Sequence, residues 1–326
     1  MDHINFPYRS ESHLALMHVI AESGAWERNS LSVDYDREID REDAHKRVPT
    51  GEIEFVSGNH VSTYAARANG DTWAYLGQTV SRNNIKLVTR KDTGIRCLED
   101  VRFRKFGSRG RHPGLNTWLY LKQNGLDPDL DQVDIVREVR GDLPGEAAGN
   151  RKSLMEMVVD ADIDACFMSQ PKTEFAERAG LKVIELPPQP MVFFMTVSSS
   201  IKMVEEHPDI VDHVLRATLE GIAFFKQNRE KTIQILMDKH DKEGVLDRDA
   251  AENLYDDLAP TLEPRLYPGL DAINNVYQEA VKQNADAAKI HPLALWNFHF
   301  LRELDDSGFI ANLYKDNPHL LTGHGG

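Results

Sequence analysis

Segments with the residue pattern of β-strands alternate with segments of helical pattern over roughly the first 200 residues, and this alternation restricts the fold most. The strand-like "INFPY" (residues 4–8) leads into "HLALMHVIAESG" (13–24), whose apolar residues recur at helical spacing. The strand-like "VRFRKFG" (101–107) leads in the same way into "LNTWLYLKQNG" (115–125). Such repeated units predict an α/β fold of parallel sheets with crossover helices, and after "PPQP" (187–190) we expect a mostly helical tail.

Two of these strand-to-helix units resemble each other. "GEIEFVSGNHVSTYAARANG" (51–70) aligns with "ADIDACFMSQPKTEFAERAG" (161–180) at one constant offset, which matches Ile53/Ile163, Glu54/Asp164, Thr63/Thr173, Ala66/Ala176 and Gly70/Gly180. Chance similarity between ordinary units of this type is the alternative. The offset pairs Asn59 and His60 with Ser169 and Gln170, at the carboxyl ends of predicted strands, where open α/β sheets bind ligands.

Size and composition indicate a compact protein of two lobes, because single cores rarely grow to 326 residues. The formal net charge of −14 argues against a nucleic-acid partner. No stretch approaches the roughly 18 apolar residues of a membrane span. Cys97 and Cys166 lack metal-ligand spacing, and Cys166, within the apolar "DACFM", is expected to be a buried small hydrophobe.

The stretch "SRGRHPG" (108–114) reads as an anion cradle. Its glycines permit close backbone approach, the following helix offers N–H donors, and Arg109, Arg111 and His112 add positive charge. The alternative is a solvated basic turn. Because no GxxxxGK[ST] or GxGxxG motif is present, nucleotide binding is disfavoured and no cofactor is expected.

The stretch "PYRSESH" (7–13) stands in the corresponding place of the first lobe. Tyr8, Arg9 and Ser10 are candidates for ligand contact there, although helix capping by Ser10 or Ser12 explains the serines equally well.

His60 has three possible roles: a neutral hydrogen-bonding group, a cation, or a catalytic acid or base. The other histidines do not have the spacing of metal ligands, so no metal site is expected. The chain has neither a GxSxG elbow nor a cysteine with an evident base, which leaves the catalytic residues of any enzyme unknown.

Four phrases carry a family resemblance: "TGIRCLEDV", "KFGSRGRHPGLNTWLYLKQNGLDP", "ADIDACFMSQP" and "HPLALWNFHFLRELDDSGFI". They resemble type II periplasmic substrate-binding proteins of the nitrate, sulfonate and thiamine-precursor class, which are subunits of ABC importers. The resemblance implies two α/β lobes joined by a two-strand hinge. Lobe one would comprise residues 1–92 and 193–326, with the C-terminal helices packed on it, and lobe two residues 93–192.

The resemblance implies binding of a small organic anion, a carboxylate or a sulfonate, between the lobes, with an ABC permease as partner. The alternative is a cytoplasmic enzyme of the same fold, a decarboxylase-like lyase or a hydrolase, acting on an aromatic or heteroaromatic acid. "YRSES" stands where a related desulfinase has its cysteine, and the cysteine-rich run of the related pyrimidine synthase is missing. As written the sequence starts without a secretory signal, which predicts a cytoplasmic protein, or a periplasmic one if a signal was trimmed.

Overall fold

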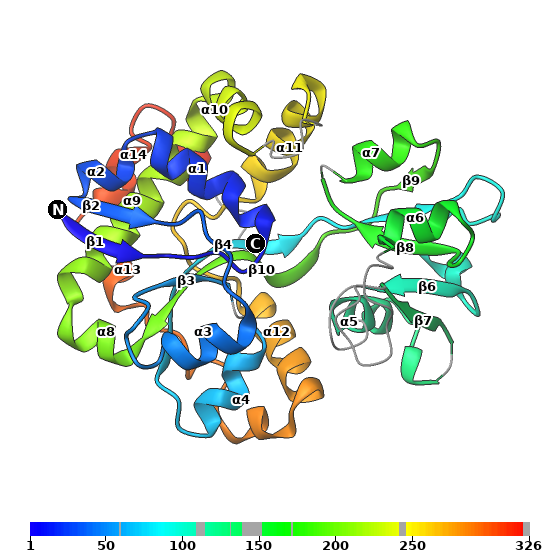
Figure 1. Cartoon of the computed structure of the whole chain (residues 1–326), viewed down its shortest axis with the longest axis horizontal. Coiled ribbons are helices and arrows are strands. Elements are labelled where there is room, and N and C mark those ends of the chain that lie inside the picture. The colour runs from blue at the N-terminus through cyan, green and yellow to red at the C-terminus, as the bar shows by residue number, and fades with distance from the viewer. Residues whose placement is uncertain are drawn as a thin grey trace. The chain divides into compact units, whose positions relative to one another are not determined.

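The computed structural model describes residues 1–58, 60–108, 115–130, 132–138, 152–170, 172–240 and 246–321. The chain divides into two compact units (Figure 1): unit 1 is Met1–Asn83 with Pro190–Gly326, and unit 2 is Asn84–Gln189. The resemblance placed these boundaries at 92/93 and 192/193. They differ because the strand at 86–89 pairs within the sheet of unit 2 and therefore belongs to that unit.

The strands of unit 1 are β1 (Asp2–Asn5), β2 (Leu31–Asp34), β3 (Val56–Ser57), β4 (Trp73–Asn83) and β10 (Gln189–Ser200). β1 and β2 are parallel, and β10 lies between β3 and β4. β3 runs antiparallel to β10, so this sheet is not wholly parallel as predicted. The reason is that β10 re-enters unit 1 from unit 2 instead of following a crossover helix.

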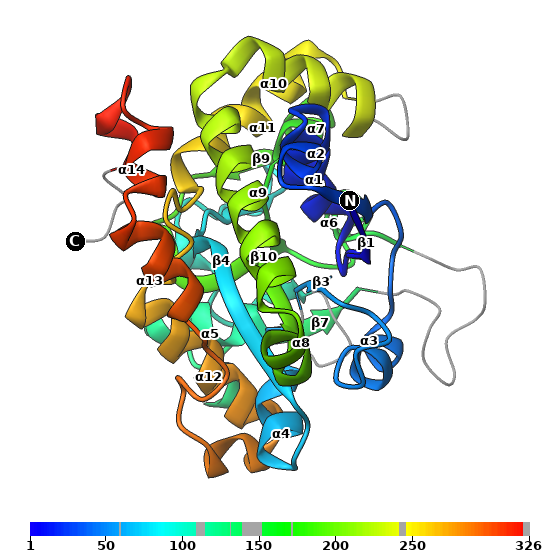
Figure 2. The same ribbon diagram turned by 90° about the vertical axis from the view of Figure 1, so that its left-hand side faces the viewer.

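Helices surround these strands, and the longest is α9 (Pro208–Gln227), which buries one apolar face. Figure 2 shows α9 between the N-terminal α1 and α2 on one side and the C-terminal α13 and α14 on the other, and α9 contacts all four. The predicted packing of the C-terminal helices on the first lobe is therefore confirmed. No helix of the described ranges has the length and apolar character needed to span a membrane.

The α-helices of unit 1 are α1 (Leu14–Glu22), α2 (Ala25–Arg28), α3 (Arg41–Arg47), α4 (Ser62–Ala68), α8 (Ile201–Glu206), α9, α10 (Arg229–Ile235), α11 (Arg248–Thr261), α12 (Leu270–Gln283), α13 (His299–Asp306) and α14 (Phe309–Leu313). Short 3-10 helices are η1 (Glu11–His13), η5 (Ala285–Lys289) and η6 (Pro318–Leu321), and η4 (Leu236–His240) is a π-helical turn.

Unit 2 holds a five-stranded sheet in the order β7-β6-β8-β5-β9. Its strands are β5 (Lys86–Thr89), β6 (Lys105–Ser108), β7 (Asp134–Arg137), β8 (Ala165–Met168) and β9 (Lys182–Ile184). β7, β6 and β8 are parallel as predicted, whereas β5 runs antiparallel to both β8 and β9. β5 runs the other way because it enters the sheet directly from β4.

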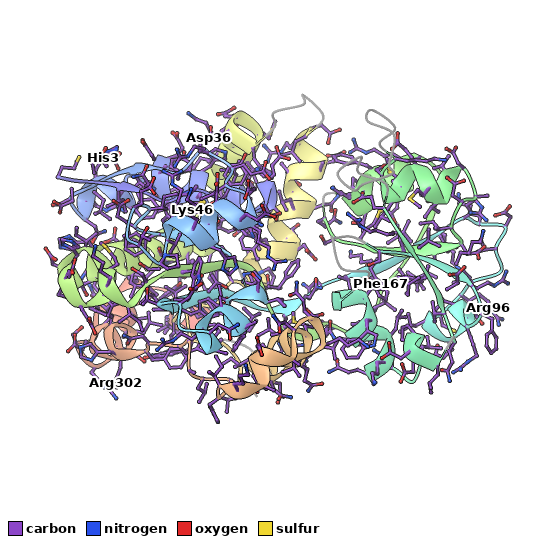
Figure 3. The ribbon with its side chains drawn as sticks, turned by 60° about the horizontal axis from the view of Figure 1, so that its bottom comes forward. His3, Asp36, Lys46, Arg96, Phe167 and Arg302 are labelled. Carbon is purple, nitrogen blue, oxygen red and sulfur yellow. The ribbon has the colours of Figure 1, made fainter. Side chains whose placement is uncertain are left out.

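The helices of unit 2 are α5 (Leu115–Gln123), α6 (Leu154–Val159) and α7 (Lys172–Arg178), with short 3-10 turns η2 (Leu98–Val101) and η3 (Pro128–Leu130). Successive strand residues face opposite sides of the sheet. Leu87 accordingly packs with Tyr120 of α5, while its neighbour Val88 packs with Met157 of α6. Phe167 on β8, labelled in Figure 3, has its ring centroid 5.1 Å from that of Tyr120.

The similarity between the two strand-to-helix units is present in the structure. α4 and α7 begin and end at residues that differ by one constant offset, the offset of the sequence alignment. Gly70 and Gly180, matched by this offset, both follow their helix with positive φ, 105° and 82°. Cys166 is fully buried, which confirms its prediction, while Cys97 is exposed.

A double-mutant cycle tests the packing of the sheet of unit 2. A Cβ at Gly107 would lie 2.4 Å from Ile163 Cδ1 and 2.9 Å from Leu154 Cδ2. We expect Gly107→Ala to lower the free energy of unfolding by about 1–3 kcal/mol through overpacking. Ile163→Val alone removes Cδ1 and should cost about 0.5–1.5 kcal/mol, but when combined with Gly107→Ala it should cost less or stabilise. Urea unfolding of the four proteins measures this, and additive costs would contradict the proposed contact.

Candidate functional site

Three chain segments run parallel and end together at one edge of unit 1. The Ser57 N–H donates to the Pro7 carbonyl (3.1 Å) and the Arg9 N–H to the Ser57 carbonyl (3.2 Å), so β3 lies beside the continuation of β1. On the other side of that continuation, the Ile39 N–H donates to the Tyr8 carbonyl at 3.0 Å. The carboxyl ends of parallel strands are where open α/β sheets bind ligands. The geometry therefore makes this edge a candidate site.

The predicted residues of the first loop lie at this edge in three different environments. Tyr8 is buried, and its main chain bridges to both neighbouring segments. Arg9 is half-buried, and its guanidinium donates to the Ile39 carbonyl. Ser10 is exposed, and its Oγ lies 3.0 Å from Ser12 Oγ; its side chain makes no cap hydrogen bond with η1. Helix capping therefore does not explain the serine at position 10. Arg9 is the residue of this loop whose positive charge could pair with an anionic ligand.

A glycine allows the loop after β3 to lie directly against Arg9. Gly58 has φ of 112°, and a Cβ there would lie 3.0 Å from Arg9 Cβ and 3.3 Å from His13 Cε1. β10 holds the loop in this position, because the Gly58 N–H donates to the Thr196 carbonyl (3.0 Å) and Ser198 Oγ donates to the Gly58 carbonyl (2.8 Å). Only glycine accepts both this backbone conformation and this contact.

Two histidines lie beside Arg9 in this cluster. His13 is buried, with Nδ1 2.8 Å from Ser57 Oγ, and the Tyr75 hydroxyl donates to the His60 carbonyl at 3.1 Å. Burial, together with the nearby Arg9 and His60, lowers the pKa of His13 to about 3. Burial and Arg9 lower the pKa of His60 to about 4, although a hydrogen bond to the Phe194 backbone opposes this shift. Both imidazoles are therefore neutral in neutral solution.

The electrostatics of the cluster favour an anion. The positive charge of Arg9 contributes to the lowered pKa of His60. Unit 1 as a whole is acidic. Unit 2 has 17 Lys and Arg and 17 Asp and Glu, so the net charge of −14 falls entirely on unit 1, with 21 Lys and Arg and 35 Asp and Glu. The cluster thus combines one guanidinium with two neutral imidazoles in an acidic unit. Within the described ranges, no three His, Cys, Asp or Glu side chains form a metal site.

Unit 2, considered by itself, has a corresponding edge at the carboxyl ends of β6, β7 and β8. The Glu138 N–H donates to the Ser108 carbonyl at 2.9 Å, and both residues are buried. Ser169 and Gln170 follow β8 at this edge, are half-buried, and come from the predicted set. The side-chain Oε1 of Gln170 is buried without a hydrogen-bond partner. Four further predicted residues lie outside the described residues: Asn59, Arg109, Arg111 and His112.

Several residues that build the cluster in unit 1 were not among the site residues predicted from the sequence. His13 was considered only among possible metal ligands, and Ser57 was not singled out. Thr196 and Ser198 belong to β10, whose "TVSSS" places four hydroxyl groups in an otherwise apolar strand, and all four are fully buried. Hydroxyls in a buried strand were the available signal, because each needs a partner.

Comparison with known families assigns the chain. A family model described as NMT1/THI5 like matches residues 13–232, more than half of the chain, from η1 into α10. The chain belongs to the NMT1/THI5-like family. A search of curated proteins found no match.

Solved structures share the fold of this NMT1/THI5-like protein. A protein of Methylobacillus flagellatus KT, named as the periplasmic sulfonate-binding protein SsuA of an ABC transporter, has a TM-score of 0.66, 15% identity, and coverage of 99% of this chain and 96% of its own. The periplasmic aliphatic sulphonate-binding protein SsuA of Escherichia coli has a TM-score of 0.64, 14% identity, and coverage of 90% and 96%. The desulfurization enzyme DszB has a TM-score of 0.59, 14% identity, and coverage of 93% and 99%. The predicted class, a type II periplasmic-binding-protein-like α/β fold, is confirmed.

Alanine substitutions at two glycines of similar φ separate the cost of backbone strain from the cost of losing space beside Arg9. Gly58 (φ 112°) touches Arg9 and His13, whereas Gly70 (φ 105°) has nothing within 4 Å of its Cβ position. We expect Gly70→Ala to cost about 1–2 kcal/mol of unfolding free energy through strain alone. Gly58→Ala should cost at least about 1 kcal/mol more because of overpacking. Equal losses in urea unfolding would show that the contact with Arg9 is unimportant.

The lowered pKa values of His13 and of the half-buried His60 predict a fall of stability in weak acid. Below pH 6.5 the unfolded chain takes up protons on His13 and His60, whereas the folded protein resists until about pH 3 and pH 4. Each histidine should therefore lower the unfolding free energy by about 1.2 kcal/mol between pH 6 and pH 5. Urea unfolding over this range gives the change of unfolding free energy with pH, which reports the number of protons taken up on unfolding. His60→Phe should take up about one proton fewer than the wild type. His3→Asn on exposed β1 is the control, and an unchanged slope in His60→Phe contradicts the assignment.

Proposed function

We propose that the protein binds a small organic anion at the edge of unit 1 where Arg9, His13 and His60 meet, as the substrate-binding subunit of an ABC importer. The observation that carries this proposal is Arg9, held against Gly58 with its guanidinium tied to Ile39, beside two neutral imidazoles. A fixed guanidinium in a partly buried site pairs strongly with a carboxylate or sulfonate, because the desolvated charge is poorly screened.

The ligand class follows from the chemistry of these groups. A guanidinium offers parallel N–H donors, which suit the flat carboxylate and the three oxygens of a sulfonate. The resemblance in fold to two sulfonate-binding proteins supports the sulfonate. Ser169, Gln170, Asn59, Arg109, Arg111 and His112 remain proposed ligand-binding residues on the basis of the sequence.

The proposed transport function implies a protein partner and a cellular location. An importer subunit delivers its ligand to a membrane permease, so we propose a permease as partner. The two sulfonate-binding relatives are named as periplasmic, and this function places the protein in the periplasm.

A second candidate function is an enzyme of the same fold that acts on an aromatic or heteroaromatic acid. The observation that favours it is His60, which keeps its basic form in neutral solution and so can accept a proton. Incubation with candidate acids followed by mass spectrometry separates the two functions. Stoichiometric binding without any change in the acid supports transport, and turnover that His60→Phe abolishes supports the enzyme.

Charge-changing variants test the anion site. Thermal unfolding with an alkanesulfonate or a benzoate should show a ligand-induced rise in Tm for the wild type. Arg9→Gln, which keeps an N–H donor but loses the charge, should weaken binding at least about tenfold, whereas Arg9→Lys should retain part of it. The Arg109→Ala/Arg111→Ala double variant should also lose the shift.

The matched control is Arg302→Gln, which removes the same charge from an exposed position on α13, labelled in Figure 3. This variant should keep the full ligand-induced shift. An unchanged shift in both Arg9→Gln and the double variant would refute the anion site.

A further inference from the structure

One ring nitrogen of His60 has an unmet hydrogen-bonding requirement. His60 Nε2 is buried and has no hydrogen-bond partner among the described residues. The rest of the residue is well anchored, because the Tyr75 hydroxyl donates to its carbonyl and the ring bonds to the Phe194 backbone. A buried polar atom without a partner costs about 1–3 kcal/mol, so such atoms at a ligand edge indicate where a ligand bonds.

The hydrogen bond with Phe194 decides what Nε2 can do. Its effect favours the protonated ring, so the backbone group is the Phe194 carbonyl and the ring donates to it. Nε2 is without a partner, so the donating nitrogen is Nδ1. In a neutral imidazole only one nitrogen carries a proton. Nε2 is therefore a lone-pair acceptor.

The equivalent position in unit 2 also has a buried acceptor atom without a hydrogen-bond partner among the described residues. The sequence alignment pairs His60 with Gln170, and α4 and α7, which follow these residues, obey the same offset. Gln170 Oε1, also an acceptor, is buried without a partner. An amide can turn to present either its oxygen or its nitrogen, whereas Phe194 fixes the tautomer of His60. His60 therefore restricts the chemistry of its hydrogen-bond partner more than Gln170 does.

We infer that the ligand of this site carries an N–H or O–H donor besides its acid group, and that His60 Nε2 accepts this donor. The inference rests on the proposed function, since Arg9 takes the acid group, and it narrows the ligand to hydroxy, amino or N–H heteroaromatic acids. Simple alkyl acids leave Nε2 without a partner and therefore bind more weakly.

Isosteric ligands measure this preference. The first set is 4-hydroxybenzoate, 4-methylbenzoate and 4-methylphenol, with the corresponding meta isomers. The second is 2-hydroxyethanesulfonate and propane-1-sulfonate. Calorimetric titration of the wild type should show that the hydroxy acid of at least one set binds about tenfold or more tightly than its methyl isostere. His60→Phe should bind both isosteres equally, and His60→Gln, which keeps a carbonyl acceptor, should retain part of the preference.

The outcomes separate the inference from the proposed function. Equal binding of the isosteres to the wild type, or a preference that persists in His60→Phe, overturns the inference and leaves the anion site intact. Binding of 4-methylphenol as tight as that of 4-hydroxybenzoate, lost in His60→Phe, supports the inference and refutes the role of Arg9. No binding of any member at millimolar concentration refutes both.

A second measurement needs no variant. In the wild type with 15N-labelled histidine, the Nε2 resonance of His60 should be that of an unprotonated nitrogen and Nδ1 that of a protonated one. The hydroxy acid should shift the Nε2 resonance, whereas the methyl isostere should not. A protonated Nε2 in the free protein overturns the inference.

Discussion

The candidate site depends on the close approach of the loop after β3 to Arg9. Gly58 permits it, and β10 enforces it through Thr196 and Ser198. Hydroxyl groups on β10 also position the chain before the loop, because Ser199 Oγ donates to the Glu54 carbonyl at 2.6 Å. A buried polar strand thus replaces the apolar packing that usually fixes such a loop. Hydrogen bonds are directional, so the position of Arg9 is set more sharply than apolar packing would set it.

Charge and burial act together at this edge. Unit 1 carries the entire excess of negative charge, which repels a free anion at long range, while Arg9 attracts it at short range. Burial keeps His13 and His60 neutral, so the cluster does not gain further positive charge in neutral solution. In the proposed anion site, the groups beside Arg9 offer neutral hydrogen bonds, which discriminate by shape and donor pattern rather than by charge.

Local patterns in the sequence predicted what is local in the structure. The constant offset between the two repeats predicted the matching bounds of α4 and α7. The apolar residues around Cys166 predicted the burial of this cysteine. The role of Ser198 was not predictable in this way, because its partner Gly58 lies 140 residues away. The boundary between the units was misplaced for a related reason. β5 reads like a continuation of β4, and only its pairing with β8 and β9 assigns it to unit 2.

The two repeats differ in the loop between strand and helix. Gly58 occupies the position that Met168 has in unit 2, and its positive φ departs from the strand conformation. Met168 ends β8 in a regular strand, and Gln170 follows with a half-buried amide. A rigid imidazole in one repeat and an adaptable amide in the other still share a buried acceptor without a partner. The missing partner follows the position in the repeat rather than the type of side chain, since an imidazole and an amide both lack one.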